Sequence, residues 1–147
     1  MEERYIMTEN QIKKLIETAI EARKKSYSPY SHYRVGAALL TSDGHMFSGC
    51  NIENAAYTPT NCAERTAFFK AVSEGVRDFT AIAIVGSPEG DEITQYSYPC
   101  GVCRQVMMEF CDPEVFQVIV ARSAEEYEIR TLKEFLPEGF GPANLDQ

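Results

Sequence analysis

Two short segments of the sequence carry residues suited to metal-assisted chemistry. In the first, Cys62 stands two positions before Glu64, and in the second, Cys100 and Cys103 form a Pro-Cys-x-x-Cys run. Zinc readily accepts thiolate ligands, and a site with three protein ligands keeps a fourth position for water, as catalytic zinc sites do. A carboxylate beside such a metal can take a proton from that water and pass it on. The two segments therefore predict one zinc per chain, held by the three cysteines, with Glu64 as acid and base.

Three thiolates would put much negative charge on one zinc ion, and the sequence offers two remedies. All three cysteines fall in the first turns of predicted helices, where the helix dipole stabilises negative charge. Arg65 follows directly after Glu64 and is placed to add a cation beside the sulfurs, and Arg104 has the same relation to Cys103. We therefore expect Arg65 above all to support the metal ligands.

A purely structural zinc module is the alternative interpretation of these cysteines. Structural zinc sites are normally closed by four protein ligands. His32 and His45 are the histidines that could supply the fourth. This alternative predicts that Glu64 has no role in function, whereas the catalytic interpretation depends on it.

The hydrophobic pattern predicts the elements that must position these residues. Amphipathic spacing and capping residues predict helices over 8–25, 62–75, 100–111 and 131–136, and apolar runs predict strands over 35–40, 45–50, 79–86, 117–121 and 126–130. Strands that alternate with helices indicate an α/β fold with one sheet, and we expect residues 1–147 to form one domain. Both cysteine-bearing helices follow irregular segments, so their N-termini can face the same place.

The charge balance narrows the class of partner. The chain of 147 residues has 14 Lys and Arg against 22 Asp and Glu, a net charge of −8. Such an acidic balance disfavours nucleic acid and anionic membranes, which bind proteins mainly through their phosphates. The sequence has no apolar run of roughly 20 residues, and its first residues lack the basic end and apolar stretch that are typical of a signal peptide. We therefore expect a cytoplasmic protein that acts on a small molecule.

Beyond these residues, the sequence resembles a known family over nearly its full length. Segments 35–38, 49–55, 62–67 and 99–105, with shorter matches near 136–142, are similar to the small, homotetrameric, zinc-dependent cytidine deaminases. The resemblance implies a three-layer α/β/α sandwich around one mixed sheet of about five strands. It also implies hydrolytic deamination of cytidine and 2′-deoxycytidine to uridine and 2′-deoxyuridine with release of ammonia, in pyrimidine salvage. Zinc-bound hydroxide would attack C4 of the base while Glu64 shuttles protons.

The same resemblance implies which residues bind the substrate. Asn51 and Glu53 would hydrogen-bond the ribose, and the backbone around Ala63 would read the pyrimidine edge. Phe140 would reach into the pocket of a neighbouring subunit of the homotetramer. Tyr33 is placed as an aromatic wall for the base, although the family usually has phenylalanine there; the tyrosine adds a hydroxyl that needs a hydrogen-bond partner.

Two other substrates are compatible with a zinc deaminase motif. One is another aminopyrimidine nucleoside, such as a nucleoside antibiotic, which the polar 51–54 segment disfavours. The other is a cytosine base within a polynucleotide, against which the sequence shows no basic stripe to follow a phosphate backbone. Cytidine and 2′-deoxycytidine are therefore the expected substrates.

Overall fold

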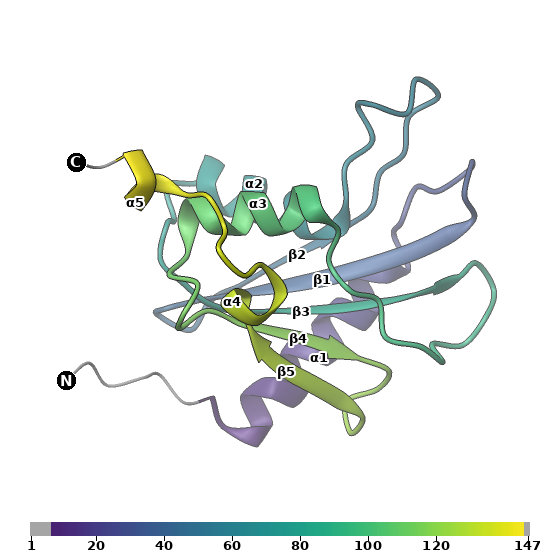
Figure 1. The fold of residues 1–147 in the computed structure, drawn as a ribbon. Coiled ribbons are helices and arrows are strands. Elements are labelled where there is room, and N and C mark those ends of the chain that lie inside the picture. The colour runs from purple at the N-terminus through teal and green to yellow at the C-terminus, as the bar shows by residue number, and fades with distance from the viewer. Residues whose placement is uncertain (1–6, 146–147) are drawn as a thin grey trace.

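A computed structural model describes residues 7–145, in which one five-stranded sheet lies between two layers of helices (Figure 1). The strands are β1 (Tyr33–Thr41), β2 (Met46–Cys50), β3 (Phe79–Pro88), β4 (Gln117–Ala121) and β5 (Tyr127–Thr131), in the order β2-β1-β3-β4-β5. The helices are α1 (Glu9–Arg23), α2 (Ala63–Ser73), α3 (Gly101–Phe110), α4 (Leu132–Phe135) and α5 (Pro142–Leu145). The predicted α/β/α sandwich around a mixed sheet is confirmed.

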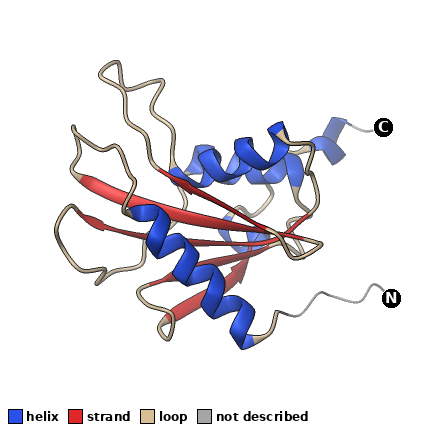
Figure 2. Cartoon of the chain, turned by 180° about the vertical axis from the view of Figure 1, so that it is seen from behind, coloured by secondary structure: helices blue, strands red, loops and turns tan. Residues whose placement is uncertain are grey.

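The sheet is mixed because one of its strand pairs is parallel. Residues 81–84 of β3 pair in parallel with 117–120 of β4, and α3 lies on the connection between these two strands. The other neighbouring strands are antiparallel. Helix α1 covers one face of the sheet, and α2 and α3 lie side by side on the other (Figure 2). The two cysteine-bearing helices therefore share one layer.

Two hydrophobic cores form because the central strands are buried on both faces. In β1, Ala37 and Leu39 pack toward α2 and α3, whereas Ala38 and Leu40 pack toward α1. Strands β3 and β4 alternate in the same way. A strand covered on both faces is apolar at every position, which is why residues 81–85 read as one continuous apolar run.

Helix α1 begins as its sequence predicts. Thr8 is the N-cap: the Gln11 N–H donates to its hydroxyl at 3.1 Å, and the Gln11 side-chain oxygen accepts from the Thr8 N–H at 3.0 Å. The helix ends at Arg23, two residues before the predicted Lys25. Among residues 7–145, no helix combines the length and the apolar character needed to cross a membrane.

Helix α2 lies directly on β2 because Gly49 has no side chain. A Cβ atom at Gly49 would lie 2.5 Å from the Ala63 carbonyl oxygen and 2.6 Å from the Ala67 nitrogen. Backbone atoms cannot yield as a flexible side chain can, so any larger residue must push the helix away. Gly49 therefore sets the depth at which α2 presents Cys62 and Glu64.

Gly49→Ala should lower the free energy of unfolding by about 1–3 kcal/mol, because the added methyl group overpacks the contact between β2 and α2. Urea denaturation measures the change. Gly101→Ala is the matched control, since the nearest atom to a Cβ there is 3.8 Å away. Equal stability of the two variants would show that α2 is free to move outward.

Candidate active site

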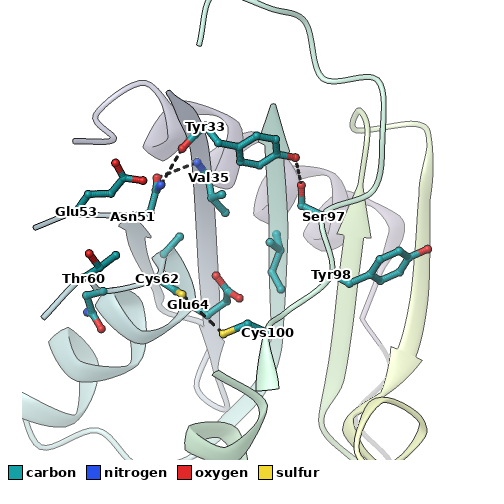
Figure 3. A pocket seen from close by; sticks show the side chains of 13 residues that line it. Tyr33, Val35, Asn51, Glu53, Thr60, Cys62, Glu64, Ser97, Tyr98 and Cys100 are labelled. Carbon is teal, nitrogen blue, oxygen red and sulfur yellow. Dashed lines mark hydrogen bonds between the residues drawn. The ribbon is translucent and has the colours of Figure 1, made fainter. Parts of the chain in front are cut away.

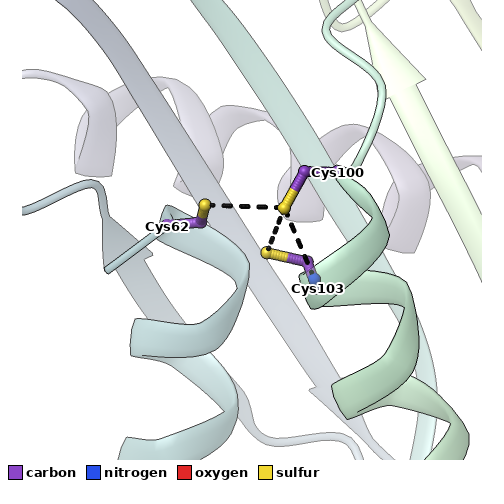
Figure 4. Close-up of side chains that lie close together, drawn as sticks. All are labelled: Cys62, Cys100 and Cys103. Carbon is purple, nitrogen blue, oxygen red and sulfur yellow. Dashed lines mark hydrogen bonds between the residues drawn. The ribbon is translucent and has the colours of Figure 1, made fainter. Parts of the chain in front are cut away.

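The three predicted ligand cysteines lie together where α2 and α3 begin (Figure 4). Cys62 is the N-cap of α2, Cys100 is the N-cap of α3, and Cys103 lies in the first turn of α3. The Sγ atom of Cys100 is 3.8 Å from that of Cys62 and 3.5 Å from that of Cys103, and all three sulfurs lie within 4.8 Å of one another. Two segments 38 residues apart in sequence thus form one cluster.

This spacing fits zinc. Ligands placed tetrahedrally at about 2.3 Å from a zinc ion lie about 3.8 Å from one another. The observed sulfur separations of 3.5 and 3.8 Å agree with that value. Among residues 7–145, no other His, Cys, Asp or Glu joins the cluster as a further ligand. The site therefore suits one zinc with a position left for a small molecule.

Positive groups surround the sulfurs as the sequence predicts. The Arg65 guanidinium donates a hydrogen bond to the Cys62 sulfur at 3.3 Å, and the Cys103 backbone N–H donates to the Cys100 sulfur at 3.4 Å. Hydrogen bonding with the Cys103 side chain, followed by the bond from Arg65, holds the pKa of the Cys62 thiol well below its ordinary value. These contacts stabilise the thiolate form that binds metal.

Arg104, the other arginine beside a ligand, does something else. Its guanidinium donates to the carbonyl oxygens of Cys100, at 3.4 Å, and Phe135, at 2.5 Å. It therefore ties the start of α3 to α4 through backbone carbonyls. Of the two arginines expected to support the ligands, Arg65 contacts a cysteine sulfur and Arg104 contacts backbone carbonyl oxygens.

Glu64 is buried beside the cysteines, with 4% of its surface exposed. Burial, together with a smaller like-charge repulsion from the neighbouring Cys62 thiolate, raises the pKa of its carboxyl group to about 7. A carboxyl group with a pKa near neutrality can both accept and return a proton at physiological pH. Figure 3 shows it on the same cavity wall as Cys62 and Cys100.

A cavity of about 380 Å³ opens above these residues (Figure 3). Its lining residues come from β1, β3, the first residues of α2, the segment after β2 and the segments that precede α2 and α3. They are Tyr33, Val35, Asn51, Glu53, Thr60, Asn61, Cys62, Ala63, Glu64, Ile84, Ser97, Tyr98 and Cys100. The cavity thus brings Glu64 and two cysteines together with four residues predicted to bind substrate.

Asn51 and Glu53 are held in place by hydrogen bonds within the chain. The Asn51 amide donates to the Tyr33 carbonyl oxygen at 2.8 Å and accepts from the Val35 N–H at 2.9 Å. The Glu53 carboxylate accepts from the N–H groups of Tyr30 and Ser31 at 3.0 and 3.1 Å. Each side chain therefore reaches the cavity in a fixed orientation.

Several residues of the cavity were not predicted from the sequence. Ser97 and Tyr98 lie in the polar segment between β3 and α3, which resembles an ordinary variable loop. Val35 and Ile84 are strand residues whose apolar character predicts only burial. Pro99, the residue between Tyr98 and Cys100, was the available sign that this segment ends at the site.

Phe140 lies outside the cavity of its own chain and is 56% exposed. Its carbonyl oxygen accepts a hydrogen bond from the Gln105 side chain at 2.8 Å, which fixes the C-terminal segment on α3. The two histidines also lie away from the sulfurs. The Nδ1 atom of His32 is 3.4 Å from Glu89, and that of His45 is 3.1 Å from Asp43. A histidine as fourth zinc ligand is therefore not supported.

Fold and site together define a zinc-dependent deaminase domain, and comparison with known proteins agrees. The family described as "Cytidine and deoxycytidylate deaminase zinc-binding region" matches residues 9–119. A cytidine deaminase of Sporosarcina psychrophila is 48% identical over 91% of this chain and 94% of its own, and one of Halalkalibacterium halodurans is 49% identical over 90% and 96%. The crystal structure of a Burkholderia pseudomallei cytidine deaminase superposes with a TM-score of 0.79 at 45% identity, covering 91% of this chain and 100% of that one. This chain belongs to the cytidine deaminase family.

Cys100→Ala should remove zinc from the purified protein, because two sulfur ligands hold the metal far less tightly than three. Zinc per chain, measured by atomic emission after dialysis, should fall from near one to well below one. Cys111→Ala is the control: this half-buried thiol closes α3 and lies outside the sulfur cluster, so zinc should stay bound. Equal zinc content in the two variants would contradict the assignment of Cys100 as a ligand.

The zinc-free protein should lose stability as pH rises from 4.5 to 7 because of Glu64. Its pKa is about 7 in the folded protein against an ordinary value of 4.5, so the folded state holds this proton more tightly than the unfolded chain. The stabilisation is complete below pH 4.5 and is lost as pH rises through 7, by about 3 kcal/mol. Urea denaturation of the wild type and Glu64→Gln across this range measures it. Parallel pH profiles of the two proteins would contradict the assignment.

Proposed function

We propose that this chain catalyses the zinc-dependent hydrolytic deamination of cytidine and 2′-deoxycytidine to uridine and 2′-deoxyuridine, with release of ammonia, in pyrimidine salvage. The observation that carries the proposal is a buried carboxyl group beside three clustered sulfurs at the wall of a 380 Å³ cavity. Zinc bound there would make a water molecule acidic enough to react at neutral pH. The position of Glu64 supports the rest of the reaction.

Glu64 is the residue that moves protons in this proposal. As carboxylate it takes a proton from the attacking water, and as carboxylic acid it returns protons to the pyrimidine ring and to the departing amino group. Its burial beside the sulfur cluster, which raises its pKa in the zinc-free chain, supports both roles, because a carboxyl group in such a place can accept and return a proton next to the metal. Water adds across the bond between N3 and C4 of the ring, and the C4–amino bond then breaks to give a C4 carbonyl and ammonia, so no reductant or oxidant is needed.

The substrate is held by the opposite wall of the cavity. Asn51 and Glu53 offer an amide and a carboxylate to the ribose hydroxyls, and their internal hydrogen bonds keep them in place before the substrate arrives. Tyr33, which lines the cavity, provides an aromatic surface for the flat base, and the backbone at Ala63, on the same lining, would read the ring edge. A site organised in advance spends less binding free energy on ordering its own side chains.

We further propose that residues 1–147 form one domain and assemble as a cytoplasmic homotetramer. A single continuous sheet with a core on each face supports one domain. The exposed ring of Phe140, anchored through its backbone to α3 but outside the cavity of its own chain, supports a role at a neighbouring subunit's pocket. Sedimentation velocity of the purified protein tests the tetramer directly.

Glu64→Gln should lower the rate of ammonia release from cytidine by more than about 100-fold while zinc stays bound, because glutamine cannot carry the proton. The assay follows ammonia and uridine with cytidine, 2′-deoxycytidine, cytidine monophosphate and cytosine as substrates. Glu74→Gln, at the other end of α2, is the matched control and should keep full activity.

Three results would contradict the proposed function. Full deaminase activity in Glu64→Gln would exclude the proposed proton transfer. Reaction of the monophosphate alone would exclude the nucleosides as substrates. Reaction of a cytosine nucleoside antibiotic without reaction of cytidine would favour the alternative substrate class.

A further inference from the structure

The cavity contains a pair of hydroxyl groups that join two distant parts of the chain. The Tyr33 hydroxyl lies 2.8 Å from the Ser97 hydroxyl, and the two residues are 64 positions apart in sequence. Tyr33 is the first residue of β1, and Ser97 lies three residues before Cys100. Figure 3 shows the Tyr33 ring reaching across the top of the cavity to Ser97.

A glycine in β3 leaves room for these two side chains. Gly86 of β3 has no side chain, and a Cβ atom there would lie 2.5 Å from the Ser97 oxygen and 3.0 Å from the Tyr33 ring. Any other residue at this position would push the two side chains aside. The close approach of three segments indicates that the hydrogen bond is part of the packed structure and is not a chance surface contact.

The 96–98 segment is held on its other side by different contacts. The Arg122 guanidinium lies 4.6 Å from the centre of the Tyr96 ring, and the Tyr98 hydroxyl donates to Glu128 at 3.2 Å. These contacts fix Tyr96 and Tyr98 to the β4 and β5 side of the sheet. The bond from Ser97 to Tyr33 fixes the same segment to β1, across the cavity.

Tyr33 also lines a neighbouring cavity. A second cavity of about 470 Å³ shares Tyr33 with the first and is otherwise lined by residues 86–95, including the acidic Asp91 and Glu92. A turn of the ring away from Ser97 would change the lining of both cavities. The hydroxyl pair therefore bears on the shape of the site, although it lies at the far side from the sulfurs in Figure 3.

We propose that Tyr33 and Ser97 are a positioning pair that sets the width of the nucleoside cavity and closes it against the second cavity. The proposal rests on the proposed deaminase function. The pair stabilises one arrangement of the wall for substrate and transition state alike, so it acts on KM and leaves kcat nearly unchanged.

A double-mutant cycle tests the proposal. Tyr33→Phe and Ser97→Ala each remove one hydroxyl and keep most of the packing, and the double variant removes both. Each single change should raise KM for cytidine by roughly 2- to 12-fold, the effect of one lost hydrogen bond, with kcat within about twofold of wild type. The double variant should match the single ones and not their product, since all three lack the same bond. Tyr27→Phe, an exposed tyrosine outside both cavities, is the control.

The free energy of unfolding, measured on the zinc-loaded proteins, shows whether the hydrogen bond forms at all, separately from whether it affects KM. If the effects of the two substitutions on the free energy of unfolding are coupled but KM does not change, the hydrogen bond forms without positioning substrate. That result overturns the proposal. Effects on KM that multiply in the double variant, or that follow Tyr33→Phe but not Ser97→Ala, overturn it as well. A wild type that releases no ammonia would instead refute the proposed function, before any variant is compared.

Discussion

The site depends on bringing three thiol groups within 4.8 Å of one another. Thiolates at this distance repel, so the backbone must hold them together and positive groups must face them. The fold does this by starting two helices at one place, with Cys62 and Cys100 as their N-caps. Three kinds of group offset the negative charge of the sulfurs: the helix N-termini, the Cys103 N–H and the Arg65 guanidinium. Because α2 and α3 both pack on the same face of the sheet, the sheet fixes their relative position.

Burial of Glu64 next to these sulfurs couples stability to chemistry. A carboxyl group in this position is costly to ionise, and the same penalty moves its pKa to about 7, where it can exchange protons. A bound zinc ion adds two positive charges nearby and offsets part of that penalty. Active sites commonly combine such local destabilisation with function, and here the surrounding apolar layers supply the compensating stability.

The opposite wall of the cavity follows a different principle, that of organisation before binding. Asn51 joins the start of β1 to the end of β2, and Glu53 is fixed by two backbone N–H groups. Across from them, Tyr33 and Ser97 connect β1 to the segment that carries Cys100. These hydrogen bonds join segments that would otherwise be ordinary loops to the sheet, so the sulfur cluster and the wall that carries Asn51 and Glu53 are held by one framework.

The sequence by itself was enough to predict the cluster of Cys62, Cys100 and Cys103, the acid and base role proposed for Glu64 beside it, and most helix and strand positions. Cys62 and Glu64 are two residues apart, so their motif can be recognised within a short segment. The apolar periodicity of a segment likewise shows which of its residues must be buried, whatever the segment packs against. Tertiary structure alone decided that β1 begins at Tyr33, that Ser97 and Tyr98 line the cavity, and that Arg104 contacts backbone carbonyls instead of sulfurs. These features depend on contacts between residues that are far apart in the sequence. No local sequence pattern predicts such a contact, because the contact forms only when the strands have paired and the helices have packed.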